Sequence, residues 1–206
     1  MTDRSFIFVI EMTKAEKTRQ WIIEQSAPIF NTRGVAGTAM SDIMAATKLA
    51  KGSLYVHFES KEELAYSAVD YILDSFSAKI TDSAGRQTTA KAKLLAVVDK
   101  LTDPTTPPVI GGCPLLNFGM ESDDTNPVIR EKVKKAINAL IKGMERIIDR
   151  GIGNGEFRSG LNAKEFATKI FAMIEGGILM SRVSGSPAQL SLIVHIIKKE
   201  IEVLKV

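Results

Sequence analysis

The sequence predicts an all-α fold in two parts, a small N-terminal three-helix unit with a helix-turn-helix and a larger helical unit after it. Apolar residues recur at helical spacing along most of the chain, every four residues from Leu64 to Ile80. Residues 38–58 fit two short helices joined by a tight turn. We therefore expect an N-terminal extension at 1–13, a helix-turn-helix domain at 14–62 and a second helical domain at 63–206.

Composition limits the classes of protein. The chain has 206 residues, of which 45% are apolar, enough for a proper core, and its net charge of +3 is weak evidence for a nucleic-acid partner. No apolar run approaches the roughly 18 residues that span a bilayer, and Phe6–Ile10 is too short for a signal sequence. We expect a cytoplasmic protein with no membrane partner. Met12 is a plausible alternative start, which would make residues 1–11 an upstream extension, although a DNA-contacting arm through Arg4 stays open.

The first helix is expected over about 14–34, with a kink at Pro28, because proline cannot donate to the carbonyl four residues earlier. Met40, Ile43 and Met44 predict the second helix, which a turn at 48–50 ends. Thr38 is expected either to cap this helix, to touch a phosphate, or both.

A short helix follows the turn and can enter the major groove of DNA, as the second helix of a helix-turn-helix does. Leu54 and Phe58 are expected in the core, with Leu54 against Ile43 and Leu49. The remaining polar positions are candidate contacts to phosphates or base edges, and glycine allows close approach of the backbone. The predicted DNA-binding residues are Thr38, Lys48, Lys51, Gly52, Ser53, Tyr55, His57 and Lys61.

The run K-G-S-L-Y-x-H-F-x-S-K-E-x-L at 51–64, together with residues 18–34, resembles the N-terminal domain of TetR/AcrR-family transcriptional regulators from about Lys14 to Leu64. Lys48 stands where that family usually has glycine, and Ala50 where it has serine or threonine. A non-glycine residue tolerates a left-handed turn at modest cost, whereas Ala50 loses both a helix cap and a phosphate contact. The resemblance implies a dimer on a palindromic operator, commonly a repressor, with a C-terminal ligand-binding and dimerisation domain.

Ser60 and Glu63 predict a capping box that begins a long helix, which carries the chain out of the first domain without a flexible linker. Leu94, Leu95, Val98 and Leu101 predict the next helix, which the segment 103–108 should end. A short helix is expected from Pro114 and a longer one over Pro127–Gly151.

The last two helices carry apolar seams with spacings of four and three. The seams are Phe166, Ile170, Met173, Gly177 and Met180, then Leu190, Val194, Ile197, Ile201 and Leu204. Such seams pack against other helices, and the resemblance implies a four-helix interface between two copies of the chain. Packing into the chain's own core is the alternative.

A small-molecule effector site is expected in the second domain, for a largely apolar ligand with a donor or cationic group facing Glu175. An ordinary core or an ion pair from Glu175 to Arg182 would explain the same residues. The lone Cys113 cannot form an intramolecular disulfide, and packing or redox sensing are its two readings. The candidate ligand-binding residues are Cys113, Phe118, Met120, Met144, Phe171, Met173 and Glu175.

Catalysis is not indicated. The sequence shows no nucleophile–base pair, phosphate-binding loop or metal-ligand spacing, so we expect no catalytic residue, no metal and no cofactor. Two alternatives remain: a helical enzyme or ligand carrier that retains a helix-turn-helix scaffold, and a DNA-binding dimer without an effector.

Overall fold

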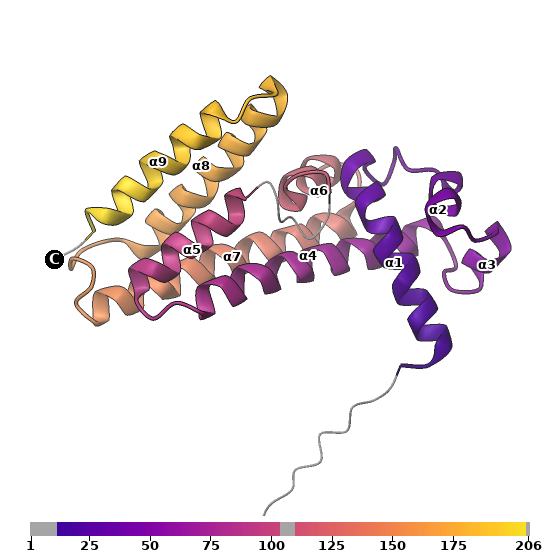
Figure 1. Cartoon of the computed structure of the whole chain (residues 1–206), viewed down its shortest axis with the longest axis horizontal. Helices are drawn as coiled ribbons and strands as arrows, with labels where there is room; N and C mark the ends of the chain where they lie inside the picture. The colour runs from indigo at the N-terminus through magenta and orange to yellow at the C-terminus, as the bar shows by residue number, and fades with distance from the viewer. Residues whose placement is uncertain (1–11, 104–109, 205–206) are drawn as a thin grey trace, which may run out of the picture.

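The computed structural model describes residues 12–103 and 110–204 of the chain (Figure 1). Within these ranges it is all-helical, as predicted. The N-terminal helices gather at one end of an elongated molecule, and the last two lie toward the other end. The helices are α1 (Lys14–Arg33), α2 (Met40–Thr47), α3 (Lys51–Tyr55), α4 (Lys61–Gly85), α5 (Ala90–Thr102), α6 (Pro114–Ser122), α7 (Pro127–Gly153), α8 (Ala163–Ser184) and α9 (Ala188–Glu202).

Helix α1 begins with a capping box, in which the Thr13 hydroxyl accepts from the Glu16 N–H and the Glu16 carboxylate accepts from the Thr13 N–H. Pro28 lies inside this helix, which continues to Arg33. The kink at Pro28 stays a prediction. The extension expected at 1–13 falls almost entirely outside the described residues, as do Arg4 and the segment 104–108.

The turn between α2 and α3 has the expected geometry. Lys48 adopts φ 56° and ψ 21°, the left-handed conformation that glycine would adopt more easily. Ala50 precedes α3 and gives it no side-chain cap. The capping role predicted for Thr38 is wrong, because α2 begins after Ala39 and the buried Thr38 hydroxyl donates to the Gly34 carbonyl at 2.6 Å.

The long helix α4 is capped by Ser60, whose hydroxyl accepts from the Glu63 N–H at 3.1 Å. The other half of the predicted capping box, in which the Glu63 carboxylate accepts from the Ser60 N–H, is wrong. The Glu63 carboxylate accepts instead from the Glu59 N–H at 2.6 Å and from Arg19 at 2.9 Å. Both bonds lower the pKa of Glu63.

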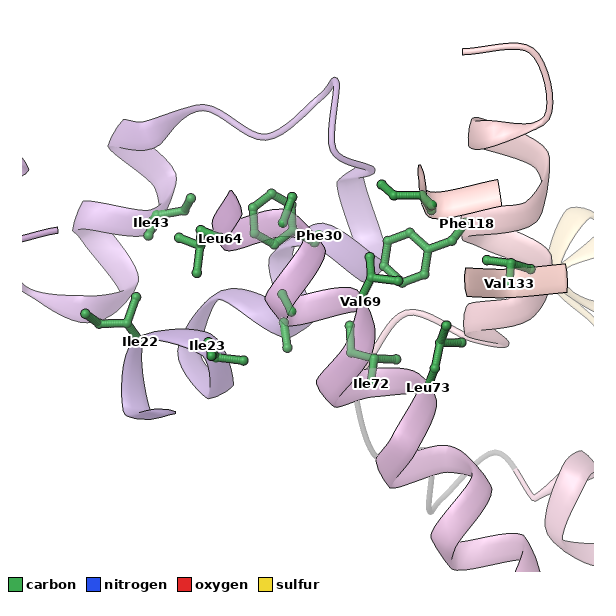
Figure 2. Packing of buried hydrophobic residues seen from close by; sticks show 14 of the residues in the cluster. Ile22, Ile23, Phe30, Ile43, Leu64, Val69, Ile72, Leu73, Phe118 and Val133 are labelled. Carbon is green, nitrogen blue, oxygen red and sulfur yellow. The ribbon is translucent and has the colours of Figure 1, made fainter. Parts of the chain in front are cut away.

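One hydrophobic cluster crosses the predicted boundary between the two domains. Ile22 and Phe30 of α1 pack with Ile43 and with the first turns of α4, and the same cluster continues to Phe118 of α6 and Val133 of α7 (Figure 2). Both parts of the chain therefore share a core, and α4 runs through it without interruption.

A second cluster fills the far end, between α5, α7, α8 and α9. Phe166, Ile170, Ile197, Ile201 and Leu204 are all buried in it. Most of the two predicted seams therefore faces the chain's own core, which was the alternative considered.

The remaining helix ends follow the sequence closely. Helix α5 ends at Thr102, before the proline-containing segment, and α6 begins at Pro114. Helix α7 begins at Pro127 and continues two residues beyond the predicted Gly151, to Gly153.

Candidate functional site

The exposed side of α3 is the candidate DNA-reading surface. Lys51, Gly52, Ser53 and Tyr55 are exposed, and the Lys51 ammonium lies 5.9 Å from the centre of the Tyr55 ring. The opposite side of α3 is anchored in the core through Leu54, which is fully buried. This five-residue helix is therefore fixed by its apolar side while its polar side faces solvent.

Three neighbours of α3 differ in exposure. Lys48 is exposed at the turn, and His57 is half-buried just after the helix. Val56, whose side chain is 79% exposed beside Tyr55, is a surface residue that the sequence reasoning missed. The signal in the sequence is that Val56 is an apolar residue among polar residues that are predicted to face DNA.

Lys61, at the start of α4, is bonded to the loop between α1 and α2. Its ammonium donates to the carbonyl oxygens of Val35 and Thr38, both at 3.0 Å. These bonds favour a structural role for Lys61, because they hold its charge against the loop between α1 and α2, and its predicted contact with DNA stays a prediction. Thr38 is withdrawn as a phosphate contact because it is 1% exposed.

The loop between α1 and α2 is also held from the second domain. The Glu121 carboxylate on α6 accepts from the N–H groups of Val35 at 3.0 Å and Ala36 at 2.9 Å. Within the first domain, Arg33 and Asp42 form an exposed ion pair at 2.7 Å. The loop that leads into the helix-turn-helix is thus held by hydrogen bonds from two helices. Lys61 of α4 donates to its carbonyls, and Glu121 of α6 accepts from its N–H groups.

A second bridge joins the segment before α6 to the end of α1. The Asn31 amide donates to the carbonyls of Ile110 at 3.1 Å and Gly112 at 3.2 Å. At Gly111, an added Cβ would lie 2.8 Å from Asn31 Nδ2, so glycine allows this close approach.

Two cavities open in the second domain. The α4–α8 cavity, of about 410 Å³, lies between α4, α5, α8 and the segment 110–114. The α4–α7 cavity, of about 430 Å³, lies between α4, α5 and α7. Both volumes suit a small molecule, and Phe76 and Ile80 of α4 line both cavities.

Only two of the seven candidate ligand-binding residues line these cavities, Cys113 the α4–α8 cavity and Met144 the α4–α7 cavity. Met120 is 69% exposed, which corrects its placement in a cavity. Phe118 is buried in the shared core, and Phe171, Met173 and Glu175 line neither cavity. Phe118 and Phe171 pack in the shared core, and Met173 packs against the second cluster.

Cys113 and Glu175 form a part-buried pair, in which the thiol donates to Glu175 Oε1 at 3.1 Å. Burial raises the pKa of both groups, so the thiol carries little of the reactive thiolate. The Glu175–Arg182 ion pair does not form among the described residues, because the Arg182 guanidinium lies against Gly112, where an added Cβ would be 2.6 Å from Nη1. In the same part of the chain, no three His, Cys, Asp or Glu side chains could hold a metal.

An apolar surface remains on the outer side of the last two helices. Leu179 and Val183 of α8, Leu192 and Ile196 of α9, and Val203 directly after α9 are all exposed. The two adjacent glycines of α8, Gly176 and Gly177, have different surroundings. A Cβ at Gly177 would lie 3.0 Å from Leu190 and Ile193 of α9, while one at Gly176 would meet nothing within 4 Å.

A helix-turn-helix with an exposed reading surface, joined through a shared core to a helical domain with cavities, defines a class of DNA-binding transcriptional regulators. The family models agree. Residues 22–68 match "Bacterial regulatory proteins, tetR family", and residues 90–197 match "Tetracyclin repressor-like, C-terminal domain". The chain belongs to the TetR family of transcriptional regulators.

Individual relatives support this assignment. The chain is 31% identical over 166 residues to the transcriptional regulator LmrA of Bacillus subtilis, covering 80% of this chain and 86% of LmrA. It is 26% identical over 170 residues to the transcriptional repressor DhaR of a Mycobacterium species, covering 80% of this chain and 82% of DhaR.

Solved structures agree over nearly the whole chain. A TetR-family regulator from Cytophaga hutchinsonii superposes with a TM-score of 0.88 at 36% identity, covering 95% of this chain and 98% of that one. A TetR regulator from Chloroflexus aurantiacus also gives 0.88 at 36% identity, covering 93% and 97%. No helix among the described residues is both long and apolar enough to cross a membrane.

Proposed function

We propose that this regulator is a cytoplasmic repressor that binds a roughly palindromic operator as a homodimer and is released by a small-molecule effector. The exposed polar side of α3, anchored through the buried Leu54, is the observation that carries the proposal. DhaR, a relative, is named as a repressor, which supports repression as the mode of action. The two cavities favour an effector over a dimer that responds to DNA alone.

The proposed DNA contacts are the residues that solvent reaches around α3. Lys48 and Lys51 supply charge for phosphates, and Gly52 lets the backbone approach the duplex. Tyr55 offers a hydroxyl and a ring, and the exposed Val56 suits the methyl group of thymine. Ser53 and His57 complete the set.

The proposed dimer uses the exposed apolar surface of α8 and α9 rather than the buried seams. A twofold axis brings the same surface of two copies together, as in most homo-oligomers. Gly176 faces outward on this surface and leaves room for a partner helix. Dimerisation sets the separation of the two α3 helices, and thus the spacing of the two half-sites.

Selection from random duplexes tests the proposal. The full-length protein is incubated with a randomised duplex pool, the retained fragments are sequenced, and the cycle is repeated. We expect enrichment of two inverted half-sites whose centres lie one helical turn, about 34 Å, or a multiple of it apart. Retained DNA with no shared sequence, or with a single half-site, would contradict operator recognition by a dimer.

A further inference from the structure

The α4–α7 cavity differs from the α4–α8 cavity in the charge of the residues that line it. Its cationic residues are Lys93 of α5 and Arg146 and Arg150 of α7, and no Asp or Glu is among the residues that line it. The α4–α8 cavity also has cations, but Asp103 lines it and lies 3.8 Å from Lys100. The α4–α7 cavity is therefore the one whose walls carry charge of a single sign.

Charge and apolar surface are separated along this cavity. Helices α4 and α7 both start on the side of α6 and run toward the far end of the molecule (Figure 1). Leu73 and Leu115 line the end near α6, whereas the cations lie toward the ends of α4 and α7. From Leu73 to Gly85 the helix rises about 18 Å, at 1.5 Å per residue. The cavity thus offers an elongated apolar wall with cations toward one end.

The three cations have no acidic partner within the described part of the chain. None of Lys93, Arg146 and Arg150 belongs to an ion pair recorded there, although six other lysines do. Lys93 is half-buried between the helices. Arg146 and Arg150 are exposed beside it, so an anionic group at this end of the cavity can form charge-assisted hydrogen bonds with all three cations.

We propose that the α4–α7 cavity binds an amphipathic anion, an elongated apolar body with one carboxylate or phosphate group, as the effector of the proposed regulator. The anionic group contacts Lys93, Arg146 and Arg150, and the apolar body lies against Phe76, Ile80 and Met144. This replaces the ligand with a cationic group expected from Glu175, which lines neither cavity. The inference rests on the proposed function for its consequence on DNA, but not for binding itself.

The position of the cavity gives binding a route to DNA. Helix α4 lines it from Leu73 to Gly85, and the same helix begins at Lys61, whose ammonium holds the loop before α2. A ligand between α4 and α7 changes the position of α4, and with it that of α3. By thermodynamic linkage, operator DNA must weaken ligand binding by the same factor that the ligand weakens DNA binding.

Calorimetric titration of the full-length protein tests the ligand class. The probes are octanoate, dodecanoate, hexadecanoate and dodecyl phosphate, each compared with a neutral alcohol of the same chain length and with dodecyltrimethylammonium. We expect at least one anion to bind at least about tenfold more tightly than its alcohol, and the cation not to bind. If no anion is preferred over its alcohol, or the cation binds best, the inference is wrong. The carboxylate and phosphate arms separate the two sources of charge.

Two pairs of variants locate the site. Gly143 lines the cavity and Gly153 does not, yet both belong to α7 and a Cβ on either meets nothing within 4 Å. Gly143→Leu should fill the cavity and weaken anion binding at least about tenfold, while Gly153→Leu binds as the parent does. Arg146→Gln should weaken the anion but not the alcohol, and Lys142→Gln, which alters a cation that does not line the cavity, should change neither. Unchanged binding in Gly143→Leu would place the ligand elsewhere.

Operator binding is measured separately with the selected duplex. If the anion binds and Gly143→Leu abolishes it while no duplex is recognised, the cavity assignment stands and the proposed function fails. If the duplex is bound but no anion is preferred, the proposed function stands and the ligand class is wrong.

Discussion

The side-chain amide of Asn117 on α6 donates to both oxygens of Asn31 on α1, to the main-chain carbonyl at 2.9 Å and to the side-chain carbonyl at 3.2 Å. It also lies 2.9 Å from the Gly111 carbonyl. Three acceptors are thus grouped around one amide at the junction of the two domains. Together with the Glu121 carboxylate, this junction makes α6 a second connection to the DNA-binding domain beside α4.

Replacement of Asn117 by alanine should destabilise the whole chain. The substitution leaves the part-buried acceptors of Asn31 and Gly111 without their donor, which typically costs about 1–3 kcal/mol. Denaturant unfolding measures the change. Asn138→Ala, an exposed asparagine on α7, is the control and should change stability by no more than about 0.5 kcal/mol. Equal stabilities would show that the junction contributes little.

Alanine substitutions at Lys51 and Lys61 should distinguish a residue that contacts DNA from one that stabilises the fold. Lys51→Ala should leave stability unchanged and reduce the slope of log K against log salt by about 0.9 for each phosphate that is no longer neutralised, or about two units for a dimer. Lys61→Ala should lower stability, because two hydrogen bonds to the α1–α2 loop disappear, and leave the slope unchanged. A reduced slope in Lys61→Ala would instead show that Lys61 contacts DNA.

Leu192 and Val194 distinguish the outer surface of α9 from its inner one. Leu192 is 61% exposed, whereas Val194 is half-buried against the second core cluster. Leu192→Glu should give a folded monomer, since a carboxylate is tolerated in water but not in an apolar dimer interface. Val194→Glu should lower the unfolding temperature of the chain itself. Sedimentation and thermal unfolding check both, and a dimeric Leu192→Glu would exclude that surface.

The sequence predicted those features that local chemistry determines. Ser60, Pro114 and Pro127 mark helix starts because each supplies a cap or a fixed φ within its own turn. As apolar residues in and after the short recognition helix, Leu54 and Phe58 are predicted in the core, and both are buried.

Features that depend on distant partners were missed. A seam at 4,3 spacing does not reveal whether it faces another copy or the chain's own core, so most of the α8 and α9 positions chosen for the dimer proved buried. The bonds of Lys61 to the carbonyls of Val35 and Thr38 have no signal in the local sequence, because both residues lie over twenty positions earlier. The α4–α7 cavity joins residues from four helices, and no local pattern unites them.

The part-buried Glu175 should make stability depend on pH. Burial raises its pKa above the ordinary value of 4.5, so the unfolded chain releases this proton at lower pH than the folded one does. Stability from this group is therefore highest below the unfolded pKa and falls as pH rises through the folded pKa. Glu175→Gln should be more stable than the parent above that range, with the gap shrinking at low pH, as denaturant unfolding across pH would show.

The control is Glu165→Gln, which alters an exposed carboxylate on the same helix. A difference between Glu175→Gln and the parent that is constant across pH would show that the effect comes from the altered contact with Cys113 rather than from ionisation.

The most direct test of α3 as the reading helix is the affinity of Tyr55→Ala for the selected duplex, measured by fluorescence anisotropy at two salt concentrations. Tyr55 is 43% exposed, so its removal should leave the unfolding temperature nearly unchanged. We predict that affinity falls at least about tenfold, because each subunit then lacks one good interaction with the duplex. A Tyr55→Ala protein that is folded, dimeric and binds the duplex as tightly as the parent at both salt concentrations would contradict the assignment.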